Sequence, residues 1–204
     1  MDQAVETAFR NECAAARIPD SYRTEAVRLD LLHNVRLLYH DGRLPQGAHS
    51  RFEEPFAIEV AGVHISGKID RIEVDAQGKA TVVDYKYRSK ERMGATKRHW
   101  EQGALVQAGL YSLAVQRMGY QPATVVYCGF KREVALCGWS EGPELVQIIQ
   151  EAKERTLTVV QQLRDGRIEP LALDEDKCRY CGYANACRKE TYAMSRTAAN
   201  RTNA

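Results

Sequence analysis

The pattern of apolar and polar positions predicts helices at the start of the chain and strands in its centre. Apolar residues recur weakly at helical spacing in Asp2–Arg17 and more strongly in Tyr22–His40, where Asp41-Gly42 ends the pattern. A loop follows at 44–50, and the next segments alternate in polarity or are rich in β-branched residues. The expected strands are Phe56–Val60, Val63–Val74 and Thr81–Tyr87.

The second half of the chain predicts two helices separated by a buried strand. Apolar faces indicate a helix over Trp100–Met118, and Ala123–Phe130 is apolar enough for a strand inside the protein. Pro143, directly after Gly142, favours the first turn of a helix whose spacing continues to Asp165-Gly166. This order of elements predicts an α/β fold in which helices flank a small mixed sheet.

The segment Gly67–Lys86 reads as a hairpin. Its most economical turn is Ala76-Gln77-Gly78, with the glycine in the left-handed position of a three-residue loop. This closure places Asp75 opposite Lys79 and sets the register of every other pair in the hairpin.

The same register brings two carboxylates together. Asp70 lies opposite Asp84, and directly opposed residues have Cβ atoms about 4.5–5.5 Å apart. Lys86 projects from the same face as Asp84 because strand side chains alternate. Facing carboxylates are costly unless a cation lies between them, so the spacing predicts a metal site.

Composition narrows the chemistry further. The 204 residues carry a formal net charge of only +2, so the chain has no overall polycationic character. No segment approaches the ~18 apolar residues of a membrane span, and charges interrupt the N-terminal segment where a signal peptide would be apolar. We expect a soluble cytoplasmic protein whose six cysteines serve metal or redox chemistry rather than disulfides.

Three separate motifs carry a resemblance to a known family. Gly67-Lys68-Ile69-Asp70-Arg71, Asp84-Tyr85-Lys86 and Gln107-x-x-x-Tyr111 resemble the RecB-type branch of the PD-(D/E)XK nucleases. The resemblance extends from about Glu53 to Arg188. It implies a restriction-endonuclease-like core with the carboxylates on its central strands, and DNA as the substrate.

The hairpin residues are suited to phosphodiester hydrolysis. Asp70 and Asp84 offer the oxygen ligands that Mg²⁺ or Mn²⁺ prefers, and the resemblance adds the carbonyl of Tyr85 as a further ligand. Lys86 would orient the attacking water or neutralise developing charge. The alternative for this set is a solvated cross-strand ion pair.

The helix after the hairpin would line the same site. Gln107 and Tyr111 share a helix face at i and i+4. The resemblance implies that Gln107 steadies the lysine or the DNA, whereas Tyr111 is either part of the site or a core residue. Glu53 matches an acidic position of the family and either borders the site or is a plain surface carboxylate.

Cys178, Cys181 and Cys187 form a C-x₂-C-x₅-C run near the end of the chain. Tight thiolate spacing of this kind favours an iron–sulfur cluster or a zinc ion over free thiols. Resemblance to the AddB-type subunits and CRISPR-associated exonucleases implies a [4Fe–4S] cluster, completed in those proteins by a cysteine near the N-terminus. Cys13 is the default fourth ligand here, or else a small buried helix residue. Cys128 and Cys137 are expected in the core.

The family also places a metal-binding histidine upstream of the hairpin. His33 and His40 are the candidates, or else ordinary surface or packing residues. The helix that contains them resembles the segment that normally follows the histidine-bearing one. On that interpretation, the chain is a truncated or separately encoded module that lacks both the histidine and the first cluster cysteine.

A basic run between the catalytic strand and the next helix is the predicted DNA contact. Its cations are either phosphate ligands or parts of a solvated loop, and Trp100 either stacks on a base or anchors the helix. The cations are Lys90, Arg92, Lys97 and Arg98.

Together these features predict a metal-dependent DNA exonuclease domain that acts in recombination and repair, working with a helicase. The alternatives are a standalone CRISPR-associated exonuclease and a catalytically silent DNA-binding or cluster-bearing module. The nuclease domain would span residues 1–188: a helical entry at 1–50, a catalytic core at 51–130, a helix at 142–165 and the cysteines at 178–187. A polar, disordered tail is expected at 189–204.

Overall fold

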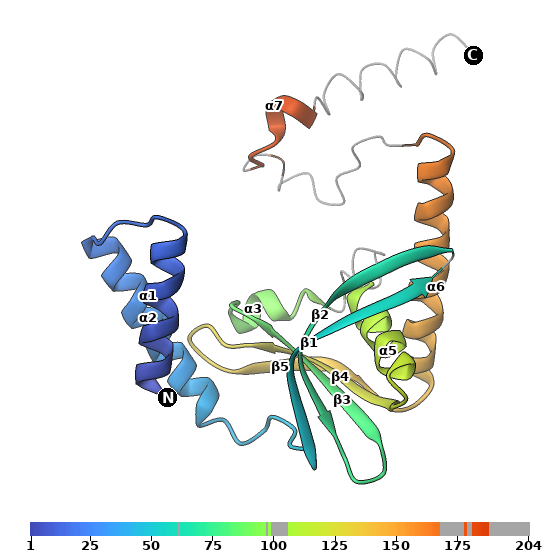
Figure 1. Cartoon of the computed structure of the whole chain (residues 1–204), viewed down its shortest axis with the longest axis horizontal. Helices are drawn as coiled ribbons and strands as arrows, with labels where there is room; N and C mark the ends of the chain where they lie inside the picture. Colours follow the sequence, from blue (N-terminus) through green and yellow to red (C-terminus); the bar gives the residue numbers. More distant parts are fainter. Residues whose placement is uncertain (61, 97, 99–105, 168–177, 179–180, 188–204) are drawn as a thin grey trace.

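The computed structural model has a five-stranded mixed sheet flanked by helices (Figure 1). It describes residues 1–60, 62–96, 98, 106–167, 178 and 181–187, so the expected tail at 189–204 lies outside the described residues. The elements are α1 (Asp2–Ala15), α2 (Tyr22–Tyr39), β1 (His49–Val60), β2 (Val63–Val74), β3 (Lys79–Lys86), α3 (Lys90–Met93), α5 (Gln107–Arg117), β4 (Gln121–Gly129), β5 (Ala135–Ser140), α6 (Pro143–Arg164) and α7 (Ala184–Cys187).

The strands follow one another in space as they do in the chain, in the order β1-β2-β3-β4-β5. The β3–β4 pair is parallel and the other pairs are antiparallel. The predicted α/β class with a mixed sheet is therefore confirmed. The parallel pair requires a crossover, which α5 provides because it lies between β3 and β4 in the chain.

The β2–β3 hairpin closes in the predicted register. Val74 pairs with Ala80, and the N–H of Asp75 donates to the carbonyl of Lys79 at 2.9 Å. Gly78 has φ 79°, the left-handed conformation that the three-residue loop requires. The Asp75 carboxylate stabilises this turn by accepting hydrogen bonds from the N–H groups of Gln77 and Lys79.

Two strands differ from the sequence-based prediction. β1 begins at His49 rather than Phe56, because its first five residues are exposed on an edge strand and lack the apolar alternation that marks burial. β5 was not predicted, since its short sequence contains Gly138. A Cβ atom at this glycine would lie 1.9 Å from the Val125 carbonyl oxygen, so the backbones approach too closely for a side chain.

The helices agree with the prediction more closely than the strands. α2 and α6 end within one residue of their expected limits. α3 is a single helical turn inside the basic run, where no helix was predicted. The described part of the third long helix begins at Gln107, and the expected start at Trp100 lies outside the described residues. None of the described helices is both long and apolar enough to cross a lipid bilayer.

The apolar core lies between the sheet and the two helices α5 and α6. It contains Ile69 and Ile72 of β2, Val115 of α5 and Ile148 of α6, all at most 1% exposed. Gly109 allows α5 to approach α6 closely, because a Cβ atom there would lie 2.4 Å from that of Ala152. The position of α5 on the sheet is thereby fixed.

The opposite face of the sheet carries a buried ion pair. Arg71 Nε donates to Glu73 Oε1 at 2.5 Å, and the guanidinium also donates to the Tyr85 hydroxyl. Burial raises the pKa of Glu73, but hydrogen bonds from the Gly47 N–H, Arg71 and Ser50 outweigh it and hold this pKa below its usual range. These bonds attach the loop before β1, and the start of β1 itself, to β2.

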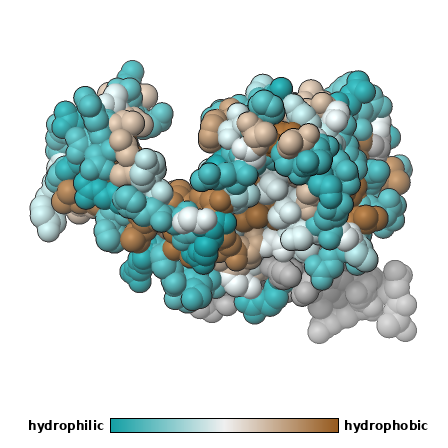
Figure 2. All heavy atoms as spheres, turned by 90° about the horizontal axis from the view of Figure 1, so that it is seen from below, coloured by the Kyte–Doolittle hydropathy of each residue, from teal (hydrophilic) through white to brown (hydrophobic). Residues whose placement is uncertain are grey.

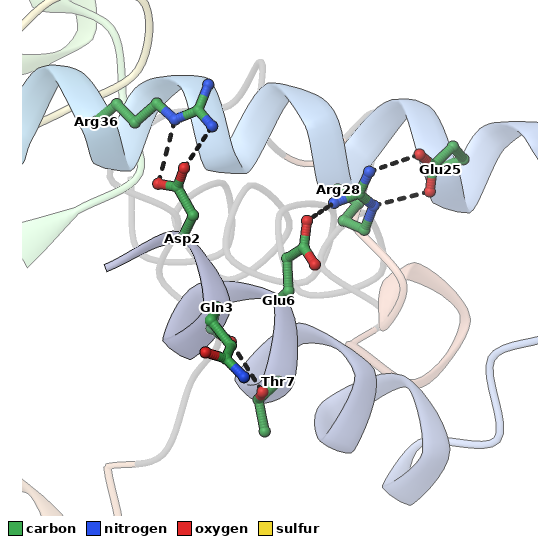
Figure 3. A network of polar contacts seen from close by, with 7 residues as sticks. All are labelled: Asp2, Gln3, Glu6, Thr7, Glu25, Arg28 and Arg36. Atoms are coloured by element: carbon green, nitrogen blue, oxygen red, sulfur yellow. Dashed lines mark hydrogen bonds and ion pairs between the residues drawn. The ribbon is translucent and has the colours of Figure 1, made fainter.

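Ion pairs join the two N-terminal helices (Figure 3). Asp2 pairs with Arg36 and Glu6 with Arg28, each at 2.6 Å. No residue of α1 is buried, so the helix rests on polar contacts that contribute little individually. Figure 2 shows this pair as a mainly hydrophilic lobe, separated by a notch from the body of the molecule.

A buried asparagine attaches α2 to the sheet. Asn34 is 1% exposed, and its Nδ2 donates to the Tyr87 hydroxyl at 3.0 Å, just beyond β3. Its Oδ1 accepts a hydrogen bond from the backbone N–H of Arg132 in the β4–β5 turn. The Tyr87 hydroxyl donates in turn to Asp30, so one turn of α2 holds the ends of three strands.

We predict that Asn34→Ala lowers the free energy of unfolding by about 2 kcal/mol, because it leaves the Arg132 N–H without its partner and removes one of the two hydrogen bonds of the Tyr87 hydroxyl. Urea denaturation followed by circular dichroism measures the loss. Asn11→Ala, on the exposed surface of α1, is the matched control and is expected to change stability by less than about 0.5 kcal/mol. Equal stabilities of the two variants would contradict this role of Asn34.

Candidate functional site

The predicted carboxylates meet where the β2–β3 ladder ends. The last pair of the ladder is Arg71 with Val83, and Asp70 and Asp84 occupy the next positions of the same register. Asp70 does not continue the backbone ladder. Instead its Oδ2 accepts a hydrogen bond from the Tyr85 N–H at 2.8 Å, so the side chain replaces a backbone acceptor at the point where the strands part.

Asp84 is the most buried polar group of the site, at 1% exposure. Its Oδ1 accepts from Gln107 Nε2 at 3.1 Å and from the Tyr111 hydroxyl at 3.3 Å. Its Oδ2 lies 2.6 Å from Lys86 Nζ as an ion pair but receives no well-aligned hydrogen bond from the described residues. One carboxylate oxygen is thus held by two donors, while the other faces only a positive charge.

Burial dominates the electrostatics of this carboxylate. Loss of solvent raises the pKa of Asp84 above its ordinary value, although the Lys86 ammonium acts in the opposite direction. The nearby Asp70 adds to the upward shift. Burial, and secondarily the charge of Asp84, also raises the pKa of Tyr111, which keeps this hydroxyl protonated as a donor.

Gln107 connects the two charged groups of β3. Its Nε2 donates to Asp84, and its Oε1 accepts from Lys86 Nζ over a longer distance of 3.5 Å. Gln107 is the first residue of α5, and Tyr111 follows one turn later on the same face. The helix therefore places an amide that can orient both the carboxylate and the ammonium.

Tyr111 combines the two roles that the sequence left open. Its ring is part of the apolar core and packs edge-on against Phe56, with centroids 5.9 Å apart. Its hydroxyl accepts from Gln107 at 2.5 Å and reaches Asp84. The residue is therefore a core residue whose polar end contacts the site.

Tyr127 was missed by the sequence analysis. It lies beside Asp84 in the parallel β3–β4 register, is 1% exposed, and places its ring centroid 5.9 Å from Lys86 Nζ. Its hydroxyl has no hydrogen-bond partner among the described residues. The only signal in the sequence is a tyrosine within an otherwise apolar strand, and its neighbour could not be identified without the register of the parallel pair.

Glu53 lies opposite Asp70 in register, because Phe52 pairs with Arg71 and Glu54 pairs with Ile69. Its backbone has φ 50°, and its exposed carboxylate pairs with Lys68 at 2.6 Å. The structure therefore places Glu53 next to the site but with its carboxylate bound to a lysine rather than to Asp70.

The upstream histidine and the cysteines are not brought to this site. His33 and His40 are exposed on or just after α2, and neither forms a hydrogen bond to Asp70 or Asp84 within the described ranges. Cys13 is half-buried on α1. Cys128 is fully buried, as expected of a core residue, and burial raises the pKa of its thiol to about 12.

The C-terminal cysteines begin with a local turn. The Cys181 N–H donates to the Cys178 carbonyl at 3.3 Å, and Cys187 ends the short helix α7. Within the described part of the chain, no three Cys, His, Asp or Glu side chains are grouped to hold a metal ion. A fourth ligand for these thiols is therefore not identified among the described residues.

The basic run directly follows β3, the strand that carries Asp84 and Lys86. Lys90 and Arg92 lie on α3 and are exposed, as is Arg98. Lys90 is 3.5 Å from Glu133, which is a long ion pair. Lys97 and Trp100, which were also predicted to contact DNA, lie outside the described residues.

The donor set fits a hard divalent cation better than a soft one. Asp70 and Asp84 offer carboxylate oxygens, and Asp84 Oδ2 is a buried acceptor without a hydrogen bond from the described residues. The Lys86 ammonium, 2.6 Å away, offsets part of the cost of burying this atom, and a divalent cation would offset more. Two carboxylates are too few for a closed protein site, which is typical of Mg²⁺ because this ion keeps several waters.

Comparison with solved structures identifies similar folds. The Eubacterium rectale protein named "Putative exonuclease" matches with a TM-score of 0.52 and 14% identity, over 92% of this chain and 70% of that chain. The structure of SSO0001 matches with a TM-score of 0.44 and 17% identity, over 92% of this chain and 80% of that chain. No curated protein matches the chain significantly.

The decisive comparison is with protein families. The model of the PD-(D/E)XK nuclease superfamily matches residues 1–188. This range includes the hairpin, the Gln107 helix and all three cysteines of the C-terminal run. With this match and with its carboxylates and lysine at the end of the central hairpin, the chain belongs to the PD-(D/E)XK nuclease superfamily.

Proposed function

We propose that this chain is a metal-dependent DNA exonuclease that acts in recombination and repair together with a helicase. The observation that supports it most directly is the state of Asp84, a carboxylate 1% exposed whose Oδ2 meets only the ammonium of Lys86 among the described residues. Burying this charge lowers the free energy of unfolding, and the carboxylate neither extends a strand ladder nor caps a helix. Superfamily membership makes DNA the expected substrate.

The residues divide the work of phosphodiester hydrolysis. Asp70, Asp84 and the Tyr85 carbonyl would hold Mg²⁺ or Mn²⁺, which when bound lowers the pKa of water and neutralises phosphate charge. Lys86 carries a positive charge at the edge of this set and orients the attacking water. Gln107 restrains Lys86 and Asp84 relative to each other through its two polar atoms.

The expected domain extent is residues 1–188, and the three C-terminal cysteines would bind a [4Fe–4S] cluster, with zinc as the alternative. The short C-x₂-C-x₅-C spacing and the hydrogen-bonded turn between Cys178 and Cys181 support this part of the proposal. The cluster would be structural, because no cysteine of the run contacts the carboxylate site among the described residues.

Nuclease activity is tested by comparing two Asp→Asn variants of one hairpin. We expect Asp84→Asn to reduce Mn²⁺-dependent degradation of labelled single-stranded DNA by on the order of a hundredfold or more, because it removes a charged ligand. Asp75→Asn is the matched control, since asparagine retains the oxygen that accepts from the turn N–H groups. Equal activity of the two variants would contradict the assignment of Asp84.

The same substitution is expected to stabilise the protein without metal. Burial raises the pKa of Asp84, so the native state favours the protonated carboxyl group. The stability that this group contributes is fully present at low pH and is lost as the pH rises through the folded-state pKa, because the buried carboxylate then ionises. Removing this charge should stabilise the protein by about 1 kcal/mol and raise Tm by roughly 2–4 °C at about pH 8.

Thermal denaturation of wild type and Asp84→Asn in EDTA over a range of pH measures this effect. The difference in Tm should shrink on acidification and vanish below the ordinary Asp pKa of 3.8, where both folded and unfolded wild type are protonated. An Asp84→Asn protein that is less stable than wild type at about pH 8 would show that the charge is well compensated within the protein.

The cluster is tested by spectroscopy of protein purified without oxygen. We expect charge-transfer absorbance in the visible range, bound iron and sulfide, and loss of all three signals in Cys178→Ala and Cys181→Ala. Cys137→Ala, at a half-buried position on β5, is the matched control and should retain them. Stoichiometric zinc without visible absorbance would instead identify the alternative metal.

A further inference from the structure

Arg132 has an unusual backbone conformation in the turn between β4 and β5. Its φ is 72°, in the left-handed region that glycine adopts freely and residues with a Cβ atom rarely do. Arg17 and Glu53 are the other non-glycine residues with positive φ among those the structure describes. A glycine would relieve the strain at position 132, yet the chain carries a long cationic side chain there.

The shape of this turn does not depend on the Arg132 side chain. The backbone N–H of Arg132 donates to Asn34 Oδ1, and the N–H of Lys131 donates to the Arg88 carbonyl at 3.2 Å. The Arg132 side chain is exposed and has neither an ion pair nor a hydrogen bond to any described residue. Within the described residues, its charge acts only through electrostatic attraction to Asp30 and Glu91, so the guanidinium is available to a ligand.

The turn lies alongside the end of the catalytic strand. The N–H of Phe130 donates to the carbonyl of Lys86 at 3.2 Å, and Arg88 follows Lys86 by two residues. Backbone hydrogen bonds therefore link the residues before Arg132 directly to the strand that carries Asp84 and Lys86.

Cations outnumber carboxylates around this turn. The carboxylates nearby are already engaged. Asp30 accepts from Tyr87, Glu133 pairs with Lys90, and Asp41 pairs with Arg43. A hydrogen bond from Ser89 lowers the pKa of Glu91. The cations of the patch, which we name the turn patch, are Arg88, Lys90, Arg92, Lys131 and Arg132. Such an excess favours a polyanion whose charges are spaced along a chain.

We propose that Arg132 binds the sugar–phosphate backbone of the nucleic-acid strand beside the scissile phosphate, supported by the other cations of the turn patch. This inference rests on the proposed nuclease function and extends it to the path of the substrate beyond the carboxylates. It accounts for an arginine in a glycine-type conformation, because the strain is retained where a cation is needed. The contact reads no base and leaves cleavage tolerant of sequence.

The test compares two Arg→Gly variants of residues with positive φ. Arg132→Gly and Arg17→Gly each remove one exposed cation and relieve one left-handed conformation, but Arg17 lies in the α1–α2 loop at the far end of α2. Binding of a fluorescein-labelled single-stranded oligonucleotide is measured by anisotropy in EDTA at several NaCl concentrations, and Tm is measured alongside.

For Arg132→Gly we expect severalfold weaker binding, a salt slope smaller by about 0.7, and Tm equal to or above that of wild type. Arg17→Gly should also keep its Tm but bind as wild type does, and Arg132→Lys should retain most of the affinity because it retains the charge. Unchanged binding by Arg132→Gly, an equal loss in Arg17→Gly, or an equal loss in Arg132→Lys would overturn the inference.

Hydrolysis of bis(p-nitrophenyl) phosphate with Mn²⁺ separates this inference from the function on which it rests. Arg132→Gly should lose more activity on DNA than on this small diester, because the diester lacks the flanking phosphates that the turn patch would bind. If wild type hydrolyses neither this diester nor DNA, the proposed function fails. The anisotropy comparison, made without metal, still decides whether Arg132 binds a polyanion.

Discussion

The burial of Asp84 is the constraint on which the arrangement of the site depends. A carboxylate at 1% exposure requires donors or a cation, and the sheet alone supplies only Lys86. The remaining donors come from α5, which can reach the carboxylate because Gly109 lets this helix pack tightly against α6. The donors that compensate the Asp84 charge are therefore in place only when α5 packs correctly, and Gln107 of α5 is one of these donors.

The parts of this site that the sequence could predict are encoded locally. A glycine turn with Asp75 at its start fixes the hairpin register, and alternation then determines which side chains share a face. The i, i+4 spacing of Gln107 and Tyr111 is equally local. The extent of the strands was less predictable, because the exposed half of β1 is defined by pairing with β2 rather than by apolar alternation.

The parts that could not be predicted depend on contacts between distant segments. Tyr127 adjoins Asp84 only because β3 and β4 pair in parallel, and no turn specifies the register of a parallel pair. Asn34 bonds to a backbone group 98 residues later in the chain, at Arg132. A lone asparagine within a helical pattern gives no indication of such a partner, so its role becomes visible only when both segments are placed.

The hairpin also shows why a turn far from the carboxylates determines what the site can do. Because strand side chains alternate, Asp70 and Asp84 share one face while Arg71 and Tyr85 share the other, where they form the buried polar network with Glu73. A shift of one residue in the β2–β3 pairing would turn the side chains of β2 over relative to β3, which would bring Arg71 onto the face of Asp84 and remove Asp70 from it. The facing carboxylates and the ion pair on the opposite face of the sheet therefore depend on one register, which the turn closed by Gly78 sets.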